Sequence, residues 1–259
     1  MNSQRDSGAS EIHAGAKAFK DRFFERYRST HVGHRKPPST RARLERRARV
    51  WRRHFGDLIP RNRKAVILDV GCGEGSFLWW LDRLGYTNSR GIEISTEELA
   101  VAQGLGVRAE RADLWDVVGA QPGAFDLILY RNVLEHFDRP QVVDILERSR
   151  VALSAGGRIV LQVPNGESPF FGRIRYGDFT HELAFTRSSI TQVLQMAGFH
   201  KIQVRPVPPV PETALGRLRI PLWKAVAILY RVLLFAEVGR GGGVITLDLI
   251  AVGEKPGDA

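Results

Sequence analysis

The stretch ILDVGCGEGSFLWWL at residues 67–81 decides the fold of this chain. Apolar residues and Asp69 form a buried-strand pattern, and three glycines follow within five positions: Gly71, Gly73 and Gly75. Glycine accepts positive φ angles and lets the backbone approach a ligand closely, at an entropic cost. Glycines at this spacing, between a strand pattern and a helix pattern, predict a ligand-binding loop.

Length and composition are those of an ordinary globular protein. The 259 residues, 43% hydrophobic and 25% charged, are enough for one large domain or for one domain with extensions. Cys72 is the single cysteine, so the sequence predicts neither an intrachain disulfide nor a cysteine-based zinc site. The first ten residues are polar and lack the apolar core of a secretory signal. We therefore expect a cytoplasmic protein, with peripheral contact at the inner membrane face as a further option.

The basic charge lies in the N-terminal quarter of the chain. The formal net charge is +10, but residues 1–65 hold 18 Lys/Arg and 6 Asp/Glu, whereas the remaining residues hold 20 and 22. We predict a basic helical extension over residues 1–64 and a main domain over residues 65–259. Helical spacing predicts an apolar stripe on that extension, formed by Leu44, Ala48, Trp51, Phe55 and Leu58.

Two roles remain open for the arginines around this stripe. In the favoured interpretation the helix docks on the domain through its stripe and the arginines are solvated. The alternative is a patch that binds phosphate, acidic lipid or nucleic acid. If the first 40 residues contact only solvent or an acidic partner, their deletion should leave cofactor affinity intact. If they are part of the core, their deletion should prevent folding.

Strand patterns alternate with helix patterns along the main domain. The predicted strands are 65–70, 89–94, 107–111, 125–130, 157–163, 201–207 and 243–255. Helix-length segments separate most of them, which predicts parallel βαβ units and a doubly wound α/β sheet with helices on both faces. The last two strands lack an ordinary crossover helix, so we expect an antiparallel last strand, with the two forming a hairpin at the edge. Such sheets bind ligands beyond the carboxyl ends of their strands, where the glycine loop falls.

The charges around the glycine loop indicate the class of ligand. A dinucleotide loop requires G-x-G-x-x-G, whereas the spacing here is closer, and no lysine follows as in a phosphate-binding loop. Asp69 and Glu74 would repel a pyrophosphate. They would attract a ligand that carries an ammonium and a sulfonium group.

ILDVGCGEG resembles motif I of the class I S-adenosylmethionine-dependent methyltransferases, and the resemblance continues in order to about residue 204. It implies a Rossmann-like, seven-stranded sheet with S-adenosylmethionine as the cofactor. It also implies that Glu93, in GIEIS, binds the ribose hydroxyls and that Asp113, in ADLWD, faces the adenine amino group. FDLILYRNVLEHF resembles the segment beside the reacting methyl group. The residues that the resemblance assigns to the cofactor are Asp69, Gly71, Cys72, Gly73, Gly75, Glu93, Ile94, Asp113, Leu114, Arg131 and Asn132.

Two histidines are candidates for a catalytic base. A hydroxyl acceptor needs one, and histidine suits that task near neutral pH. His181, in YGDFTHELAFT, is the first candidate, with Asp178 or Glu182 orienting its imidazole; Tyr176, Asp178 and Glu182 are predicted to bind the acceptor. His136, in LEHF, is the second and is expected nearer the cofactor. The alternatives are that His136 only holds the cofactor loop and that His181 only caps the following helix with Glu182. No metal ligand is predicted.

The acceptor is the least determined part of the prediction. The string D-x-T-H-x-x-x-F-T resembles one in small-molecule and sugar methyltransferases, including bacterial ones associated with surface polysaccharide synthesis, so we expect O-methylation of a sugar or glycolipid. The alternatives are a small molecule of quinone or natural-product type, RNA, and a catalytically silent cofactor-binding domain. Nucleic acid is less favoured, because Cys72 is badly placed as a nucleophile and no N/D-P-P-Y/F string follows the fourth strand.

Residues 208–243 form an insertion between the last two predicted strands. PPVPE predicts a stiff linker, and IPLWKAVAILYRVLLFAEVG predicts an amphipathic helix because Lys224, Arg231 and Glu237 interrupt its apolar run. Lys224 and Arg231 are seven residues apart and share one face. The other faces are expected to pack on the protein, on a second copy in a homodimer or on a membrane surface, with the first favoured.

Overall fold

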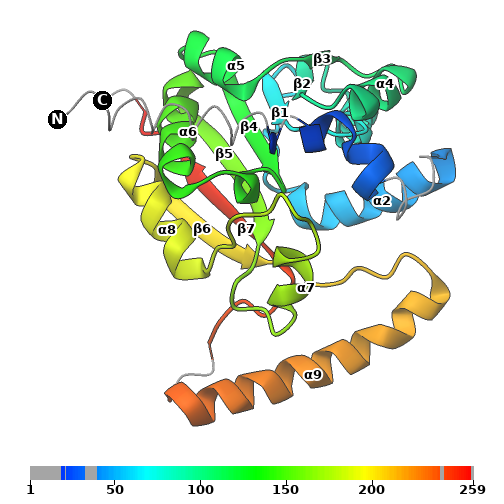
Figure 1. The fold of residues 1–259 in the computed structure, drawn as a ribbon, viewed down its shortest axis with the longest axis vertical. Coiled ribbons are helices and arrows are strands. Elements are labelled where there is room, and N and C mark those ends of the chain that lie inside the picture. The colour runs from blue at the N-terminus through cyan, green and yellow to red at the C-terminus, as the bar shows by residue number, and fades with distance from the viewer. Residues whose placement is uncertain (1–18, 21, 33–39, 240–241, 258–259) are drawn as a thin grey trace.

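A seven-stranded sheet forms the centre of the molecule in this computed structural model, which describes residues 19–20, 22–32, 40–239 and 242–257 (Figure 1). The strands lie in the order β3-β2-β1-β4-β5-β7-β6. Their bounds are β1 Ile67–Val70, β2 Ser89–Glu93, β3 Ala109–Arg111, β4 Phe125–Arg131, β5 Leu153–Pro164, β6 His200–Pro206 and β7 Asp248–Glu254. Strands β1 to β5 pair in parallel, and β7 is antiparallel to both of its neighbours. The predicted doubly wound sheet with an antiparallel last strand is confirmed.

The last strand differs from expectation in its position. The predicted hairpin exists, since β6 and β7 pair antiparallel, but β7 lies between β5 and β6, so β6 forms the edge. The burial of the two strands accounts for this order. β7 is almost fully buried, with apolar Leu249 to Val252 at its centre, whereas burial alternates along β6.

Helices cover both faces of the sheet. Their bounds are α2 Arg41–Phe55, α3 Ser76–Arg83, α4 Thr96–Gly104, α5 Leu114–Ala120, α6 Arg139–Ala152, α7 Phe171–Arg175, α8 Arg187–Met196 and α9 Ala214–Val238, with short turns η1 Arg28–Val32 and η2 Leu134–His136. One apolar core lies between the sheet and α5, α6 and α8; the other lies under α2, α3 and α4. The sequence did not predict α5, a short helix that begins at Asp113 as its N-cap.

Helix α2 belongs to the second core. Trp51 and Phe55 contact the ring of Phe77 on α3 at centroid distances of 5.6 and 5.3 Å. Leu44 and Leu58 of the predicted stripe are also buried, and Ala48 is half-buried. The docking of this helix through its apolar stripe is therefore confirmed. Its arginines are not all solvated as expected, because Arg47 pairs with Glu74 on the domain.

The register of the parallel strands places the glycine loop among other polar groups. Val70, the last residue of β1, pairs with Ile92 on one side and with Tyr130 on the other. The residues that follow these three positions lie together at the edge formed by the carboxyl ends of the strands. That edge carries Gly71, Glu93 and Arg131.

Candidate active site

The glycine loop leaves β1 in a conformation that its glycines make accessible. Gly71, Gly73 and Gly75 have φ values of +63°, +56° and +72°. A Cβ atom at Gly71 would lie 2.6 Å from Val133 Cγ2, and one at Gly75 would lie 2.7 Å from Val107 Cγ2. At Gly73 only Glu98 Oε2 lies within 4 Å, at 3.9 Å. The loop is therefore packed at both ends and open in its middle, as a cradle for a ligand requires.

Glu93 is tied to this loop through its carboxylate. Its Oε2 accepts a hydrogen bond from the Gly73 N–H at 2.8 Å, and its Oε1 accepts from the N–H groups of Ile94 and Ser95 at 2.9 Å each. Burial raises the pKa of this carboxyl group, while the three N–H donors favour its ionised form. Oε2 keeps lone-pair capacity for a hydroxyl donor, whereas Oε1 already accepts two hydrogen bonds. The predicted role of Glu93 in binding ribose hydroxyls stays a prediction that this geometry fits.

Asp69 and Arg131, both predicted to contact the cofactor, bind each other. Arg131 Nη2 donates to Asp69 Oδ2 at 2.9 Å and its Nε lies 3.4 Å from Oδ1. The guanidinium also stacks 4.2 Å from the centroid of the Phe77 ring. Asp69 is fully buried, so this pair neutralises its charge beneath the loop and fixes the ends of β1 and β4 relative to each other.

The remaining predicted cofactor residues surround the same edge of the sheet. Asp113 caps α5, where its Oδ1 accepts from the Trp115 N–H at 3.2 Å, and Leu114 is buried behind it. Ile94 is exposed, at 37%. Asn132 adopts a φ of +58°, which asparagine tolerates better than most residues, and its N–H donates to Gln162 O. Cys72 is buried, and burial raises the pKa of its thiol above the usual range, so it is not poised as a nucleophile.

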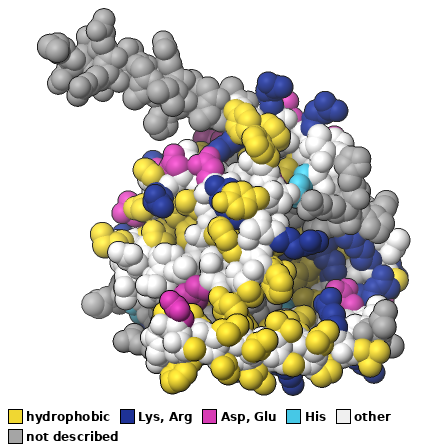
Figure 2. Space-filling model, turned by 60° about the horizontal axis from the view of Figure 1, so that its bottom comes forward, with side chains coloured by type: hydrophobic (Ala, Val, Ile, Leu, Met, Phe, Trp, Pro, Cys, Tyr) yellow, Lys and Arg dark blue, Asp and Glu magenta, His cyan; other side chains and the backbone are white. Residues whose placement is uncertain are grey.

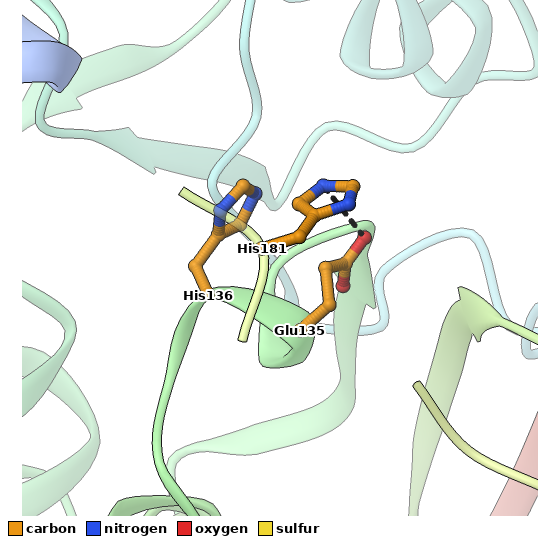
Figure 3. A group of neighbouring side chains, drawn as sticks. All are labelled: Glu135, His136 and His181. Atoms are coloured by element: carbon orange, nitrogen blue, oxygen red, sulfur yellow. Dashed lines mark ion pairs between the residues drawn. The ribbon is translucent and has the colours of Figure 1, made fainter. Parts of the chain in front are cut away.

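A cluster of Glu135, His136 and His181 lies after β4, beside this edge (Figure 3). Glu135 and His136 come from the turn η2, and His181 comes from the segment between β5 and α8. The two imidazole rings meet edge to face with centroids 4.7 Å apart, and His181 Nε2 lies 3.9 Å from Glu135 Oε1. Backbone hydrogen bonds hold the two segments together, since Glu135 O accepts from the N–H groups of Glu182 and Leu183.

The hydrogen-bond partners fix which ring nitrogen of each histidine carries the proton. His181 Nδ1 lies 3.0 Å from the carbonyl oxygen of Ile174, which only accepts, so Nδ1 is protonated and Nε2 keeps its lone pair. The Thr180 hydroxyl donates to Asp178 Oδ1 at 2.6 Å and therefore accepts from His136 Nδ1 at 2.9 Å. Both histidines thus keep an unprotonated Nε2.

Ionisation in the cluster follows from burial. Burial lowers the pKa of His136 to about 4 and also lowers that of His181, so both are neutral near pH 7. Burial also raises the pKa of Glu135 to about 8, against smaller opposing effects of its own backbone N–H and the Asn132 amide. Neither carboxylate oxygen of Glu135 makes a hydrogen bond of ordinary geometry within the described residues. Such a group is costly unless it binds a proton or a cation.

Asp178 lies in the cluster but does not orient His181 as predicted. Its Oδ2 is 4.0 Å from His181 Nε2, beyond hydrogen-bond distance, because the Ile174 carbonyl fixes that ring instead. Burial alone would raise the pKa of Asp178, but hydrogen bonds from Thr180 and Tyr27 hold this pKa at about 2. Asp178 therefore positions His136 through Thr180.

The other two predicted acceptor residues lie outside the cluster. Tyr176 is 76% exposed, and Glu182 forms an ion pair with Lys20 at 2.6 Å. A role of Glu182 in orienting His181 receives no support from these contacts.

Residues 19–20 and 22–32 lie over the site, which the sequence did not predict (dark blue in Figure 1). The Tyr27 hydroxyl donates to Asp178 Oδ2 at 2.6 Å, and the Phe24 ring meets His136 edge to face at 5.3 Å. Arg28 Nη1 lies 3.3 Å from both carboxylate oxygens of Glu98, beside the glycine loop. Of the two options for the first 40 residues, contact with only solvent or an acidic partner does not hold for these described ones, because their aromatic and cationic side chains pack against the site.

The arrangement supports two kinds of chemistry. The neutral Nε2 of His181 is suited to accept a proton, with Glu135 beside it. The cluster also has the composition of a divalent-cation site, since one ligand atom of each residue lies within 4.8 Å of the others. The sequence did not assign Glu135 any role, although LEHF places an acidic residue directly before His136.

Comparison with known proteins identifies the family. The family model described as "Methyltransferase domain" matches residues 43–204. A ubiquinone biosynthesis O-methyltransferase of Cupriavidus pinatubonensis is 25% identical over 156 residues, which is 54% of this chain and 61% of the relative. A phenazine O-methyltransferase of Lysobacter antibioticus is 30% identical over 42% of this chain and 34% of the relative. An ajmaline N-methyltransferase of Rauvolfia serpentina is 34% identical over 39% of this chain and 37% of the relative. Each match spans less than two thirds of the relative's length.

Solved structures share the fold at low sequence identity. A SAM-dependent methyltransferase from Archaeoglobus fulgidus superposes with a TM-score of 0.59 at 17% identity, covering 80% of this chain and 94% of its own. A phosphoethanolamine N-methyltransferase of Haemonchus contortus, in complex with S-adenosyl-L-methionine, superposes with a TM-score of 0.56 at 18% identity. The match covers 84% of this chain and 57% of the solved chain. The glycine cradle lies at the carboxyl edge of a seven-stranded sheet, and the family match covers most of the chain. This protein therefore belongs to the methyltransferase domain family.

Proposed function

We propose that this enzyme methylates a hydroxyl group of a small molecule with a flat, apolar ring system. The observation that carries the proposal is the state of His181, a neutral imidazole with its Nδ1–H held by the Ile174 carbonyl and its Nε2 directed toward a buried carboxyl group. An alcohol or phenol is a poor nucleophile while protonated, and a fixed imidazole can remove that proton in the transition state.

The cofactor residues proposed from the sequence fit S-adenosylmethionine. The cradle is open at Gly73, and Glu93 Oε2 can accept a hydroxyl donor beside it. The nearby carboxylates of Glu74 and Glu98 are paired with Arg47 and Arg28. Asp113 lies at the next strand end. When bound, S-adenosylmethionine supplies a methyl group that its sulfonium already activates.

The residues of the cluster have distinct proposed roles. His181 Nε2 takes the proton of the acceptor hydroxyl, and an ionised Glu135 at 3.9 Å stabilises the imidazolium that forms. Asp178 holds His136 through Thr180, so that His136 forms one wall of the site. The enzyme otherwise needs only to align the two reactants and exclude water.

The surroundings favour a ring-shaped acceptor over a sugar. Phe24 and Tyr27 meet the His136 ring at 5.3 and 6.3 Å, and Phe179 stacks with Phe23 at 5.8 Å. Aromatic faces bind flat apolar rings well but leave many sugar hydroxyls without hydrogen-bond partners. The relatives named for ubiquinone biosynthesis, phenazine and ajmaline support the same class. The sugar or glycolipid acceptor expected from the sequence has no comparable support.

A divalent cation is the second candidate for activating the hydroxyl. One observation favours it: the buried carboxylate oxygens of Glu135 lack an ordinary hydrogen-bond partner among the described residues and lie close to two histidine side chains. A bound cation would lower the pKa of a coordinated hydroxyl.

The acceptor class can be tested by supplying S-adenosylmethionine with a labelled methyl group to fractionated cell extract. Label in a small-molecule fraction, with saturable transfer to phenolic or hydroxyquinone-type test compounds, is the expected result. Label in glycolipid would restore the sugar acceptor, and label in RNA would contradict both. Binding of cofactor without transfer to any fraction would identify a catalytically silent domain.

A further inference from the structure

Helix α9 presents an apolar face to solvent along its whole described length. Leu218, Leu222 and Leu229 on this outward face are 71%, 67% and 59% exposed. Val232 and Leu233 continue it, so the positions recur at the spacing of one side of an α-helix. Figure 2, with the face that carries α9 turned forward, shows hydrophobic side chains in a band across its lower part. A contiguous exposed apolar surface of this kind marks an interaction site.

The opposite face of α9 fixes the orientation of the helix. Ala227 is buried, and the Tyr230 hydroxyl donates to the carbonyl oxygen of Glu167 at 3.2 Å. The half-buried residues on this inward face are Ile220, Trp223, Tyr230 and Leu234. These contacts show that the inward face of α9 packs on the protein, as the sequence predicted for this helix. They leave the outward face without a partner among the described residues.

Positive charge borders the outward face. Arg217, Lys224 and Arg231 recur every seven residues and are all exposed, so they form one row beside the apolar band. The helix carries a fourth basic residue, Arg219, and one acidic residue, Glu237. A basic row beside an apolar band is complementary to a surface that is apolar inside and negatively charged at its rim.

From this juxtaposition we propose that α9 is an interfacial helix that docks the enzyme on an acidic lipid bilayer. The apolar band enters the boundary between headgroups and acyl chains, and the basic row contacts anionic headgroups. The helix lies on the bilayer surface, since no helix among the described residues is both long and apolar enough to cross a membrane. This inference does not depend on which acceptor the enzyme uses.

A second copy of the chain fits this face less well than a bilayer does. In a two-fold dimer with antiparallel α9 helices, the row of Arg217, Lys224 and Arg231 would face the same row of the partner, so like charges would meet. The outward apolar band is also wider than a coiled-coil seam, because Ile228 and Phe235 extend it on one side and Val226 on the other.

The position of α9 would bring the acceptor side of the enzyme toward the bilayer. Helix α7 lies between the sheet and α9 in Figure 1, and the residues that flank it, Phe170 and Tyr176, are exposed. The segment from α7 leads directly to His181. A bilayer under α9 would therefore lie on the side from which this segment covers the site.

Sedimentation with lipid vesicles tests the proposal with the full chain. Vesicles of phosphatidylcholine with one quarter phosphatidylglycerol are compared with vesicles of phosphatidylcholine alone. We expect the wild type to bind the anionic vesicles at least tenfold more tightly, and less so as salt rises. The double variant Leu222→Glu/Leu229→Glu should lose at least tenfold in binding. Lys224→Glu/Arg231→Glu should lose the preference for anionic lipid.

Met196→Glu is the matched control, because Met196 on α8 is 74% exposed and equally apolar. It should bind vesicles as the wild type does, and thermal unfolding should show that all variants fold. The proposal is overturned if the wild type does not sediment with anionic vesicles or if Met196→Glu loses as much binding as the double variant. It is also overturned if light scattering shows a dimer that Leu222→Glu/Leu229→Glu dissociates while vesicle binding is absent, which would assign the face to a second copy.

Discussion

Two buried carboxylates, Glu93 and Glu135, show how differently the two halves of the site are built. Glu93 is the last residue of β2 and Glu135 follows β4, and both are nearly inaccessible, at 8% and 0% exposure. Glu93 receives three backbone N–H hydrogen bonds, whereas neither oxygen of Glu135 makes one of ordinary geometry. Burial raises the pKa of both, to about 8 for Glu135. Although both carboxylates are buried, Glu93 is held by hydrogen bonds on the predicted cofactor side. Glu135, on the predicted acceptor side, can still bind a proton or a cation.

The backbone around each carboxylate explains the contrast. Glu93 stands where β2 turns into the N-terminus of α4, and such turns offer free N–H groups. Glu135 stands in a 3₁₀ turn whose main chain is used to bind the segment of His181. Its side chain is therefore held in place without being satisfied.

The largest expected effect tests the acceptor half. His181→Ala should lower turnover by about 10²- to 10⁴-fold, the usual contribution of a general base, while cofactor affinity stays within a few-fold of the wild type. The control His200→Ala, which replaces a histidine on strand β6, should leave both turnover and cofactor affinity unchanged. His136→Ala should disturb turnover and cofactor binding together. Steady-state kinetics and calorimetry measure the two quantities; if the two histidine variants exchange these results, His136 is the base.

The next effect tests the cofactor half. Glu93→Ala should weaken binding of S-adenosylmethionine at least tenfold, because hydrogen bonds to a charged acceptor contribute about 1.5–3 kcal/mol each. Calorimetric titration measures the affinity, and Glu110→Ala, at an exposed acid on β3, is the control. If a folded Glu93→Ala protein binds S-adenosylmethionine with unchanged affinity, Glu93 does not bind the cofactor.

The pH dependence of Glu135→Gln sharpens the contrast between the two carboxylates. In the wild type, turnover should rise as the pH increases through about 8, because ionised Glu135 stabilises the His181 imidazolium. Glutamine cannot ionise, so the variant should show no rise in this range. A wild-type profile that is flat from pH 6.5 to 9 would contradict the assigned role.

The free energy of unfolding provides a second, independent test of Glu135. The pKa of Glu135 in the folded state is raised from its ordinary value of 4.5 to about 8. Its contribution to stability is therefore full below pH 4.5 and is lost as the pH rises through 8, with a slope of up to about 1.4 kcal/mol per pH unit. Denaturant unfolding of the wild type, but not of Glu135→Gln, should show this loss.

The smallest expected effect concerns metal. If His181 acts as the base without a cation, removal of divalent ions with EDTA should change turnover less than twofold. A large loss that manganese, magnesium or zinc restores would instead show that Glu135, His136 and His181 hold a cation, and Glu135→Gln should then abolish the restoration.

Local sequence was sufficient to bring the predicted cofactor residues together and insufficient to predict the contacts around His136 and His181. Glycine spacing, the strand patterns and an acid at a strand end lie within 30 residues, and parallel pairing brings them to one edge. The contact between His136 and His181 joins residues 45 positions apart through hydrogen bonds of Glu135 and Thr180, which no pattern encodes. The placement of Tyr27 and Arg28 on the site depends on tertiary packing of the N-terminal segment. The unsatisfied state of Glu135 is visible only when all of its neighbours are known.

The adjacent residues Tyr27 and Arg28 have a consequence for the kinetic order of the reaction. Tyr27 bonds to Asp178 on the acceptor side, and Arg28 pairs with Glu98 on the cofactor side. One short helical segment therefore closes both halves, and a movement that frees one also frees the other. We therefore expect release of the spent cofactor and release of the product to be coupled, because both would require this segment to move.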